Sequence, residues 1–317
     1  MHKLITVIGG TGVQGGSVAR ALLNNDNYVV RVVTRNTKSE AANSLRAQGA
    51  EIVQADLNDA SSLQTAFVGS YAIFAATNFF DSFLTVGADE SVERESTQGI
   101  NLAKAAAATP TLQHYIWSTL PNAGRISNGK AFVPHYAGKN RVDDYIKSDP
   151  VLLSKTTFLW VSFYVSNMDY PWYKPIPVVG AGPDRYIQLF PGSPSVPLTL
   201  VGDARTNIGL FVREILEQPQ KTLPGKFVLA ATDEMTMAEL VSLWASVHGK
   251  KADCVQVDRK MYYDMWPMWG QVMDASHIYW DQAKEKTWSG EDTILTRHDL
   301  GVIGLIDTAT ALANMGI

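Results

Sequence analysis

The stretch that decides the fold is Lys3 to Asn24, KLITVIGGTGVQGGSVARALLN. It begins with a short apolar β-branched run, passes through a glycine-rich turn, and continues with apolar residues at helical spacing. Glycines at positions 9, 12 and 15 let such a chain turn tightly, approach a pyrophosphate closely, and pack a helix against a sheet. The free N–H groups of the new helix favour a phosphate at its N-terminus. The stretch therefore predicts a dinucleotide-binding entrance.

The composition fits a globular chain with one large domain and an appended lobe. Of the 317 residues, 46% are hydrophobic and only 18% are charged, which allows a sizeable core. The net charge of −4, with Lys and Arg scattered along the chain, provides no polybasic surface for nucleic acid or anionic lipid. The single cysteine, Cys254, excludes an internal disulfide and a cysteine-based metal cluster, and it suits a reducing compartment.

Targeting signals are not recognisable in the sequence. The chain enters its first predicted strand within three residues, which leaves no space for a signal peptide. No apolar run reaches the length of about 18 residues that a membrane span requires. We therefore expect a cytoplasmic protein with no membrane partner and no nucleic-acid partner, and we leave its oligomeric state open.

Strands and helices alternate through the first half of the chain. Apolar, β-branched runs predict strands at 4–8, 28–34, 51–55, 71–76, 114–118 and 157–161, and helical patterns lie between them, including long ones at about 89–108 and 134–147. This alternation requires crossover connections, so it predicts a parallel sheet with ligands at the carboxyl ends of its strands. The predicted fold class is α/β, a doubly wound parallel-sheet Rossmann domain with a smaller C-terminal α+β substrate lobe.

The pattern changes after the sixth predicted strand. Seven prolines fall between residues 170 and 197, too many for regular elements. Later signals are interrupted, with a helix expected at 237–247 and a strand at 254–257. We predict a dinucleotide-binding Rossmann domain at 1–168 and a mainly substrate-covering lobe at 169–317, some segments of which return to the Rossmann sheet.

Two residues that follow predicted strands are candidates to contact the adenosine end of a dinucleotide. Arg35 directly follows the second strand, where NAD-preferring proteins carry an acidic residue for the ribose 2′-hydroxyl. A guanidinium suits a 2′-phosphate instead, so we predict NADP(H) as the cofactor. Lys38 is either a second phosphate ligand or an exposed lysine. Asp56, after the third strand, is a candidate acceptor for the adenine amino group or the N-cap of the next helix, and the two roles are compatible.

Polar side chains also end the next two predicted strands. Thr77 and Asn78 follow the fourth strand, and Ser118 and Thr119 end the fifth. At the carboxyl ends of parallel strands such groups face the ligand crevice, although all four are also ordinary turn residues.

Several segments together carry a family resemblance: GGTGVQG (9–15), VVTRN (32–36), AATNFF (75–80), and IWSTLPNA (116–123) followed by VPHYAGKNRVDDYI (133–146). They resemble the NmrA-like family of atypical short-chain dehydrogenase/reductase proteins, over most of residues 1 to about 168. The resemblance implies a Rossmann domain with a smaller C-terminal lobe, a preference for NADP(H), and membership of a family divided between reductases and cofactor-sensing regulators.

The resemblance also assigns residues. It implies cofactor contacts from Gly9, Thr11, Gly12, Gln14, Gly15 and Arg35, an active-site role for Lys139, and further cofactor contacts from Tyr164 and Asn167 within SFYVSN (162–167). We add Val13, which lies within the turn, and Leu57, which follows Asp56, to the predicted cofactor-binding residues, together with Thr77 and Asn78.

The sequence departs from the usual pattern at the proton donor. Typical short-chain dehydrogenases use Tyr-x-x-x-Lys, but the residue four before Lys139 is His135, and Tyr136 lies about 100° around the helix. Lys139 can hold nicotinamide ribose hydroxyls and lower the pKa of a nearby donor. Three alternatives follow: His135 replaces the tyrosine, Lys139 with bound water supplies the proton, or no reaction occurs. His135 is otherwise a helix-start residue bonded to backbone.

An aromatic and methionine-rich stretch, MYYDMWPMWGQVMDASHIYW, covers residues 261–280. Packing of the core and lobe is its simpler interpretation, because such side chains offer broad apolar contact. The alternative is an apolar or aromatic substrate pocket, for which the candidates are Phe79, Phe80, Tyr136, Trp266 and Trp269.

Motifs for metal sites and hydrolases are absent from the sequence, and the six histidines are dispersed, so no metal is expected. The leading hypothesis is an NADPH-dependent reductase that transfers hydride to a small, largely apolar or aromatic carbonyl, enone or imine. Lys139 would then orient the ribose and assist protonation, with Ser118, Thr119 or His135 polarising the acceptor atom. The alternative is a non-catalytic NADP-sensing regulator that docks a protein partner.

Overall fold

The computed structural model describes residues 2–316 and contains one large parallel sheet of eight strands. Their order across the sheet is β13-β10-β6-β5-β4-β1-β2-β3. In chain order the strands are β1 (Lys3–Ile8), β2 (Tyr28–Thr34), β3 (Glu51–Gln54), β4 (Ala72–Ala75), β5 (His114–Thr119), β6 (Thr156–Val161), β10 (Lys226–Ala230) and β13 (Ile294–Leu295). The first six strands follow the Rossmann order, in which the switch point lies between β1 and β4.

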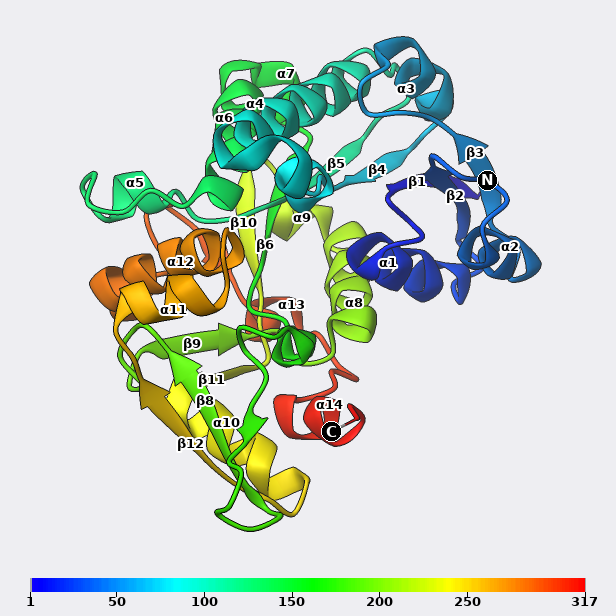
Figure 1. The fold of residues 1–317 in the computed structure, drawn as a ribbon. Coiled ribbons are helices and arrows are strands. Elements are labelled where there is room, and N and C mark those ends of the chain that lie inside the picture. The colour runs from blue at the N-terminus through cyan, green and yellow to red at the C-terminus, as the bar shows by residue number, and fades with distance from the viewer. Residues whose placement is uncertain (1, 317) are drawn as a thin grey trace.

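Helices cover both faces of this sheet (Figure 1). On one face α1 packs against α8, and on the other α4 packs against α3 and α6. The helices on the two faces are α1 (Val13–Leu23), α2 (Glu40–Ala47), α3 (Ala60–Phe67), α4 (Phe80–Ala107), α6 (Pro134–Ser148), α7 (Pro150–Leu153), α8 (Ala204–Glu217), α9 (Pro219–Thr222) and α13 (Arg297–Leu300). The short helix α5 (Ala123–Ile126) contributes instead to a separate hydrophobic core. The predicted fold class is thereby confirmed.

The apolar pattern of strand β5 explains this three-layer arrangement. Successive side chains of a strand point to opposite faces, and every residue of β5 is buried. Ile116 joins the core under α1 and α8, whereas Tyr115 and Trp117 join the core under α3, α4 and α6. A strand buried on both faces reads as a continuous apolar run, as a central parallel strand should.

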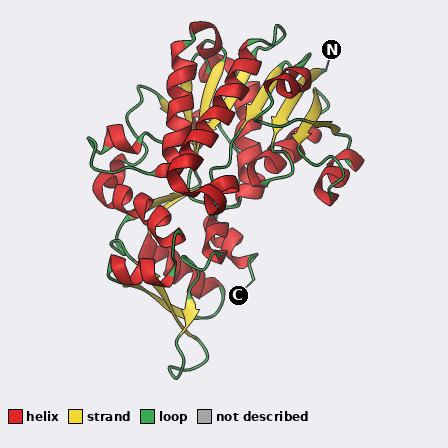
Figure 2. Cartoon of the chain, turned by 45° about the horizontal axis from the view of Figure 1, so that its top comes forward, coloured by secondary structure: helices red, strands yellow, loops and turns green. Residues whose placement is uncertain are grey.

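A smaller body lies beyond the carboxyl ends of the central strands (Figure 2). Its strands form a three-stranded sheet in the order β12-β8-β7 and a two-stranded ladder of β11 with β9. Its elements are η1 (Val165–Asp169), β7 (Ile176–Pro177), β8 (Arg185–Phe190), β9 (Pro197–Leu200), β11 (Asp233–Thr236), α10 (Met237–Val247), β12 (Lys251–Gln256), α11 (Arg259–Met265), α12 (Trp269–Ala283), η2 (Lys284–Lys286) and α14 (Thr308–Ala313). The C-terminal end of the chain lies in this body (Figure 1).

Two sequence-based expectations about elements are wrong. The proline-rich segment 170–197 contains strand β8, because Pro183 and Pro191 flank that strand and leave its backbone donors intact. Pro177 lies in β7, which is the edge strand of its sheet and tolerates a missing donor. Helix α4 begins at Phe80 rather than near residue 89, and it contains a kink at Gly87, whose φ is 79°.

Segments from the second half of the chain return to the large sheet, since β10 pairs with β6 and with β13. The division of the chain at residue 168 stays a prediction. Among residues 2–316, the helices are all too short or too polar to cross a membrane.

Candidate functional site

The glycine turn after β1 is as tight as its sequence requires. Gly9 adopts a φ of 64°, and the Gly12 N–H donates to the Gly9 carbonyl at 2.8 Å. A Cβ at position 15 would lie 2.4 Å from the Gly9 oxygen, so only glycine fits there. Helix α1 then starts at Val13 with no side chain capping its N-terminus. Its first backbone N–H groups are therefore available to an anion.

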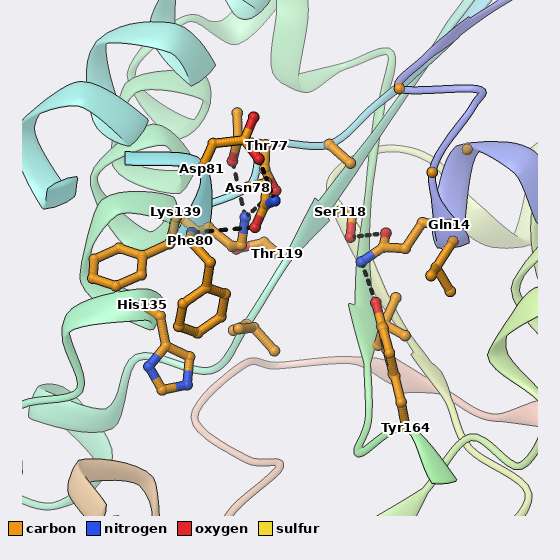
Figure 3. A pocket seen from close by; sticks show the side chains of 18 of the residues that line it. Gln14, Thr77, Asn78, Phe80, Asp81, Ser118, Thr119, His135, Lys139 and Tyr164 are labelled. Atoms are coloured by element: carbon orange, nitrogen blue, oxygen red, sulfur yellow. Dashed lines mark hydrogen bonds between the residues drawn. The ribbon is translucent and has the colours of Figure 1, made fainter. Parts of the chain in front are cut away.

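One cavity of about 820 Å³ extends from this turn along the carboxyl ends of the central strands to helix α12 (Figure 3). Apart from Trp266 and Lys38, the residues named in the sequence-based site line it: Gly9, Thr11, Gly12, Val13, Gln14, Gly15, Arg35, Asp56, Leu57, Thr77, Asn78, Phe79, Phe80, Ser118, Thr119, His135, Tyr136, Lys139, Tyr164, Asn167 and Trp269. The fold thus brings together residues from six strand ends. Their individual roles stay predictions.

Gln14 joins three of these strand ends through its side-chain amide. Its Nε2 donates to the Tyr164 hydroxyl at 2.6 Å, and its Oε1 accepts from the Ser118 hydroxyl at 2.7 Å (Figure 3). Burial raises the pKa of Tyr164, so its phenol is neutral at physiological pH. The amide fixes the start of α1 against the ends of β5 and β6.

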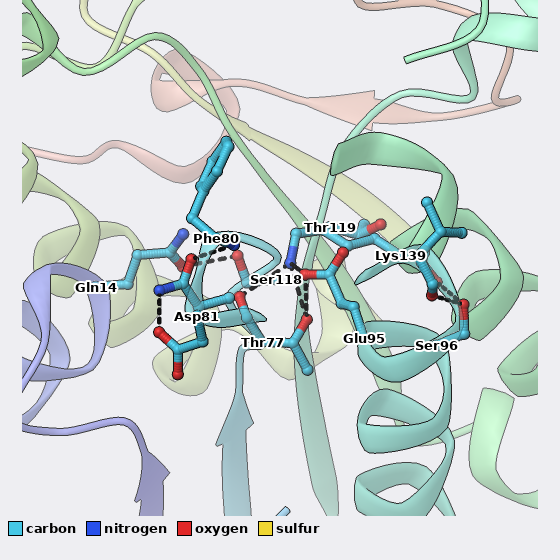
Figure 4. A network of polar contacts seen from close by, with 12 residues as sticks. Gln14, Thr77, Phe80, Asp81, Glu95, Ser96, Ser118, Thr119 and Lys139 are labelled. Carbon is cyan, nitrogen blue, oxygen red and sulfur yellow. Dashed lines mark hydrogen bonds and ion pairs between the residues drawn. The ribbon is translucent and has the colours of Figure 1, made fainter. Parts of the chain in front are cut away.

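Lys139 is buried, and its ammonium is fully hydrogen-bonded by the protein. Its Nζ donates to Glu95 Oε1 at 2.7 Å, to Thr77 Oγ1 at 2.9 Å and to the Thr77 carbonyl at 3.0 Å (Figure 4). The Thr77 hydroxyl in turn donates to Glu95 Oε1 at 2.9 Å. An ammonium has three N–H donors, so all of them are used. Binding of a ligand hydroxyl to Lys139 requires the exchange of one of these bonds.

Glu95 was not predicted from the sequence. It lies in the middle of α4 with a side chain only 1% exposed, and its second oxygen, Oε2, has no hydrogen-bond partner. A Cβ on Gly138 would come within 2.7 Å of that oxygen, so the glycine beside Lys139 makes room for the carboxylate. A glycine inside a predicted helix, directly before the candidate lysine, was the one local signal of this close approach.

His135 is held neutral beside the cavity. Burial, the positive charge of Lys139 and His277 lower its pKa to about 3. Its Nε2 lies 3.3 Å from the Ser276 hydroxyl oxygen, and its Nδ1 has no protein partner. The adjacent Tyr136 also lines the cavity, and burial raises its pKa to about 12. Neither side chain is charged at physiological pH.

Thr119 is hydrogen-bonded to a buried carboxyl group that was also not predicted from the sequence. Its hydroxyl donates to Asp143 Oδ2 at 2.9 Å, and the Trp117 indole donates to Asp143 Oδ1 at 2.8 Å. Burial raises the pKa of Asp143 to about 7 despite these bonds. Asp143 lies four residues after Lys139, one turn further along the same face of α6.

A continuous aromatic wall forms one side of the cavity. It consists of Phe80, His135, Trp269, Trp172 and Tyr170, all of which line the cavity. The rings of Trp172 and Trp269 stack with centroids 4.5 Å apart, and Tyr170 stacks on Trp172 at 5.1 Å. Phe80 connects Trp269 to His135 at centroid distances of 5.5 Å to each. This wall suits a flat apolar ligand.

The two tryptophans predicted to line the substrate pocket, Trp266 and Trp269, lie in different surroundings. Trp269, at the start of α12, belongs to the aromatic wall, whereas Trp266 does not line the cavity and packs on Tyr262 at 4.7 Å. The expectation that Trp266 lines the substrate pocket is not met. The Trp266 side chain packs against the hydrophobic core of the lobe instead.

The adenosine end lies beside β2 and β3. Arg35 donates to Asp81 of α4 at 2.9 Å. Asp56 accepts from the backbone and side chain of Asn58, at 2.9 and 2.8 Å, and the helix cap is Asp59, which accepts from the backbone of Ser61. The prediction that Asp56 itself is the N-cap is therefore wrong, and its carboxylate remains at the cavity. Lys38, the other candidate cation, is exposed and outside the cavity lining.

The cavity at the switch-point end of a doubly wound sheet defines a Rossmann-type nucleotide-binding architecture. The family model for the NmrA-like family matches residues 1–298. The chain therefore belongs to the NmrA-like family, and the resemblance predicted from its motifs is confirmed. Across residues 2–316, no three His, Cys, Asp or Glu side chains gather as they would around a metal ion.

Known proteins of both functional kinds are similar to this chain. An NmrA-like family domain-containing oxidoreductase of Aspergillus hancockii is 31% identical over 259 residues, which cover 79% of this chain and 74% of that protein. The crystal structure of NmrA, a negative transcriptional regulator in complex with NADP, matches with a TM-score of 0.77 at 21% identity, covering 99% of this chain and 95% of that one. The triphenylmethane reductase of Citrobacter sp., complexed with NADP(H), matches with a TM-score of 0.68 at 18% identity and 98% coverage of both chains. These structural matches establish the fold.

Proposed function

We propose that this protein is an NADPH-dependent reductase that transfers hydride to a small, largely apolar or aromatic carbonyl, enone or imine. The observation that carries the proposal is the single cavity that joins the glycine turn to the aromatic wall. The similarity to a named oxidoreductase of the same family supports it. A dinucleotide site that ends at an apolar pocket is what such a reaction requires.

The residues of the cavity fit an NADP(H) molecule. The tight glycine turn, in which the Gly12 N–H bonds to the Gly9 carbonyl, and the uncapped start of α1 suit a pyrophosphate. Arg35 would hold the 2′-phosphate, and Asp56 and Leu57 would contact the adenine. Thr77 and Asn78 would follow the cofactor along the end of β4. Lys139, Tyr164 and Asn167 would hold its nicotinamide half.

When bound, NADPH would supply the hydride, and the protein would position the acceptor and let it take the matching proton from a water molecule held by Lys139. Lys139 places a positive charge where negative charge develops on the acceptor atom, and one of its N–H groups turns from Thr77 to the ligand. His135 is neutral, so it contributes a hydrogen bond rather than a charge. Ser118 and Thr119 present hydroxyl groups at the same strand end. The aromatic wall gives the acceptor an apolar surface to pack against.

A second candidate function is a non-catalytic NADP-sensing regulator that docks a protein partner. Two observations favour it. All three N–H donors of Lys139 are satisfied by Thr77 and Glu95. A histidine, His135, also occupies the usual tyrosine position. A similarly folded protein, NmrA, is a negative transcriptional regulator. The aromatic wall favours the reductase, because a sensor does not need an apolar surface at the nicotinamide end.

NADPH consumption over a panel of quinones, enones, cyclic imines and aryl ketones separates the two functions. We expect turnover with at least one flat apolar substrate and a loss of about a hundredfold in the Lys139→Ala variant, the range attributed to one stabilising donor. Lys251→Ala, at an exposed position of β12 outside the cavity, is the control. NADPH binding without turnover across the whole panel would instead support the regulator. A cytoplasmic location and the absence of nucleic-acid and membrane partners remain predictions.

A further inference from the structure

A fixed carboxylate stands beside the cation of the adenosine end. Arg35 Nη2 donates to Asp81 Oδ2 at 2.9 Å. Asn78 Nδ2 donates to the other Asp81 oxygen at 2.6 Å (Figure 3). The Arg35 side chain is 71% exposed and that of Asp81 is 44% exposed. Asn78, three residues before Asp81, thus holds the Asp81 carboxylate in place. Within residues 2–316, the Arg35 side chain makes no hydrogen bond other than the one to Asp81. Of the two, the guanidinium is the freer to move.

The charge balance of this end is unfavourable for a phosphate. Within the described part of the chain, the Lys and Arg side chains that line the cavity are Arg35 and Lys139, and Lys139 is already paired with Glu95. The carboxylates that line the cavity are Asp56 and Asp81. Arg35 therefore provides one positive charge against two negative ones, a net charge of 1 − 2 = −1 for this end.

This charge balance weakens the binding of NADP(H) but not that of NAD(H). A 2′-phosphate that recruits Arg35 must open the Arg35–Asp81 pair, which is cheap because the pair is exposed. The carboxylate of Asp81 stays in place on Asn78, however, and repels the phosphate dianion. A free ribose 2′-hydroxyl meets no such repulsion and gains a carboxylate acceptor, the group that NAD-preferring Rossmann proteins use.

We propose that Asp81 determines the cofactor selectivity of this site: it weakens the binding of NADP(H) through its charge beside Arg35, and it accepts a hydrogen bond from the 2′-hydroxyl of NAD(H). The inference rests on the dinucleotide binding of the proposed function but not on catalysis. Arg35 alone would give a strong preference for the phosphate form, and Asp81 moderates it. Selectivity therefore depends on a residue of α4 that is 46 positions away from Arg35 in the sequence.

Calorimetric titration of the full-length protein with NADPH and with NADH tests this assignment. We expect Asp81→Asn to bind NADPH roughly tenfold tighter at low salt, because one unit of negative charge beside the phosphate is removed. The same variant should bind NADH equally or more weakly. The NADPH gain should shrink at about 0.5 M salt, where exposed charges are screened. Asp89→Asn, an equal charge change at an exposed position of α4 outside the cavity, should leave both affinities unchanged.

Two results with the Asp81 variants would overturn the inference. An unchanged ratio of NADPH to NADH affinity in Asp81→Asn and Asp81→Ala would show that the carboxylate does not discriminate. Weaker NADPH binding in both variants would show that Asp81 aligns Arg35 for the phosphate rather than opposing it. Urea unfolding of each variant checks that it folds. A wild-type protein that binds neither dinucleotide would refute the proposed function and the inference together, whereas binding without turnover would refute only the reductase.

Discussion

Lys139 and Glu95 form an ion pair, 2.7 Å long, that is buried between helices α6 and α4. The candidate active-site lysine is thus held in place by a carboxylate whose side chain is only 1% exposed to solvent. Thr77 completes the arrangement by accepting from Lys139 and donating to Glu95. The end of β4, the middle of α4 and the first turns of α6 therefore share one polar network (Figure 4).

The first prediction concerns the stability of this pair. Replacement of Glu95 by Ala leaves a buried ammonium without its counter-ion, so we expect the free energy of unfolding to fall by about 3–5 kcal/mol. Glu90→Ala is the matched control, because Glu90 pairs with Arg94 on the exposed side of the same helix. That change should cost about 1 kcal/mol or less. Urea unfolding measures both values, and equal losses would mean that Glu95 is not the counter-ion of Lys139.

The sequence predicted the elements that depend on local signals. Strand β2 was predicted with its observed bounds, and so was helix α10, which begins at Met237. Both carry their own signals: a β-branched run in β2, and apolar periodicity in α10 behind a capping box formed by Thr236 and Glu239. The glycine turn and the strand-end polar residues were found for the same reason, because strand ends of a parallel sheet converge wherever the strands are correctly placed.

Several site residues that lie outside the recognised motifs were not predicted. Glu95 and Asp81 are acidic residues on a long helix, and nothing in their local pattern separates them from solvated charges. Trp172 lies in the proline-rich segment for which no regular elements were expected. Only the structure shows that it stacks on Trp269, which is 97 positions away in the sequence. Trp266 and Trp269 are indistinguishable by composition, and the turn between α11 and α12 decides which one faces the cavity.

The second prediction distinguishes those two tryptophans. Trp269→Ala removes the ring that joins Trp172 to Phe80, so we expect substrate affinity to fall by at least tenfold. Trp266→Ala should leave affinity unchanged, because that ring lies outside the cavity lining. Steady-state KM values for a substrate found in the panel measure both effects. Equal losses in the two variants would point to damage of the lobe rather than of the wall.

The third prediction concerns the contact between α1 and α8. A Cβ at Gly209 would lie 2.2 Å from the Ser17 carbonyl oxygen, and Ser17 also bonds to the backbone of both Thr206 and Gly209. Gly209→Ala must push the two helices apart, so we expect a loss of about 1–3 kcal/mol in unfolding free energy. Gly124→Ala in α5 is the control, since its Cβ would meet nothing closer than 3.6 Å. Thermal unfolding that ranks the two variants equally would contradict the close packing.

The fourth prediction concerns acid stability, which depends on three buried groups with shifted pKa values. Burial lowers the pKa of His135 and of His114 to about 3, below the value of about 6.5 in an unfolded chain. Between these values the unfolded state binds more protons, so each histidine makes the fold less stable as pH falls from about 6.5. Asp143 acts in the opposite direction, because its folded pKa of about 7 exceeds the unfolded value of about 3.9. It stabilises the fold as pH falls through that window.

Substitution of each group should therefore change the slope of stability against pH in a defined direction. Between pH 6.5 and pH 5, His135→Asn should reduce the loss of unfolding free energy by about 2 kcal/mol, and Asp143→Asn should increase it by a similar amount. His298→Asn, at an exposed position, is the control for the loss of a histidine. Urea unfolding at a series of pH values measures the slopes. A slope unchanged in His135→Asn would mean that the pKa of His135 is the same in the folded and the unfolded protein, and it would restore that side chain as a candidate proton donor for the reductase.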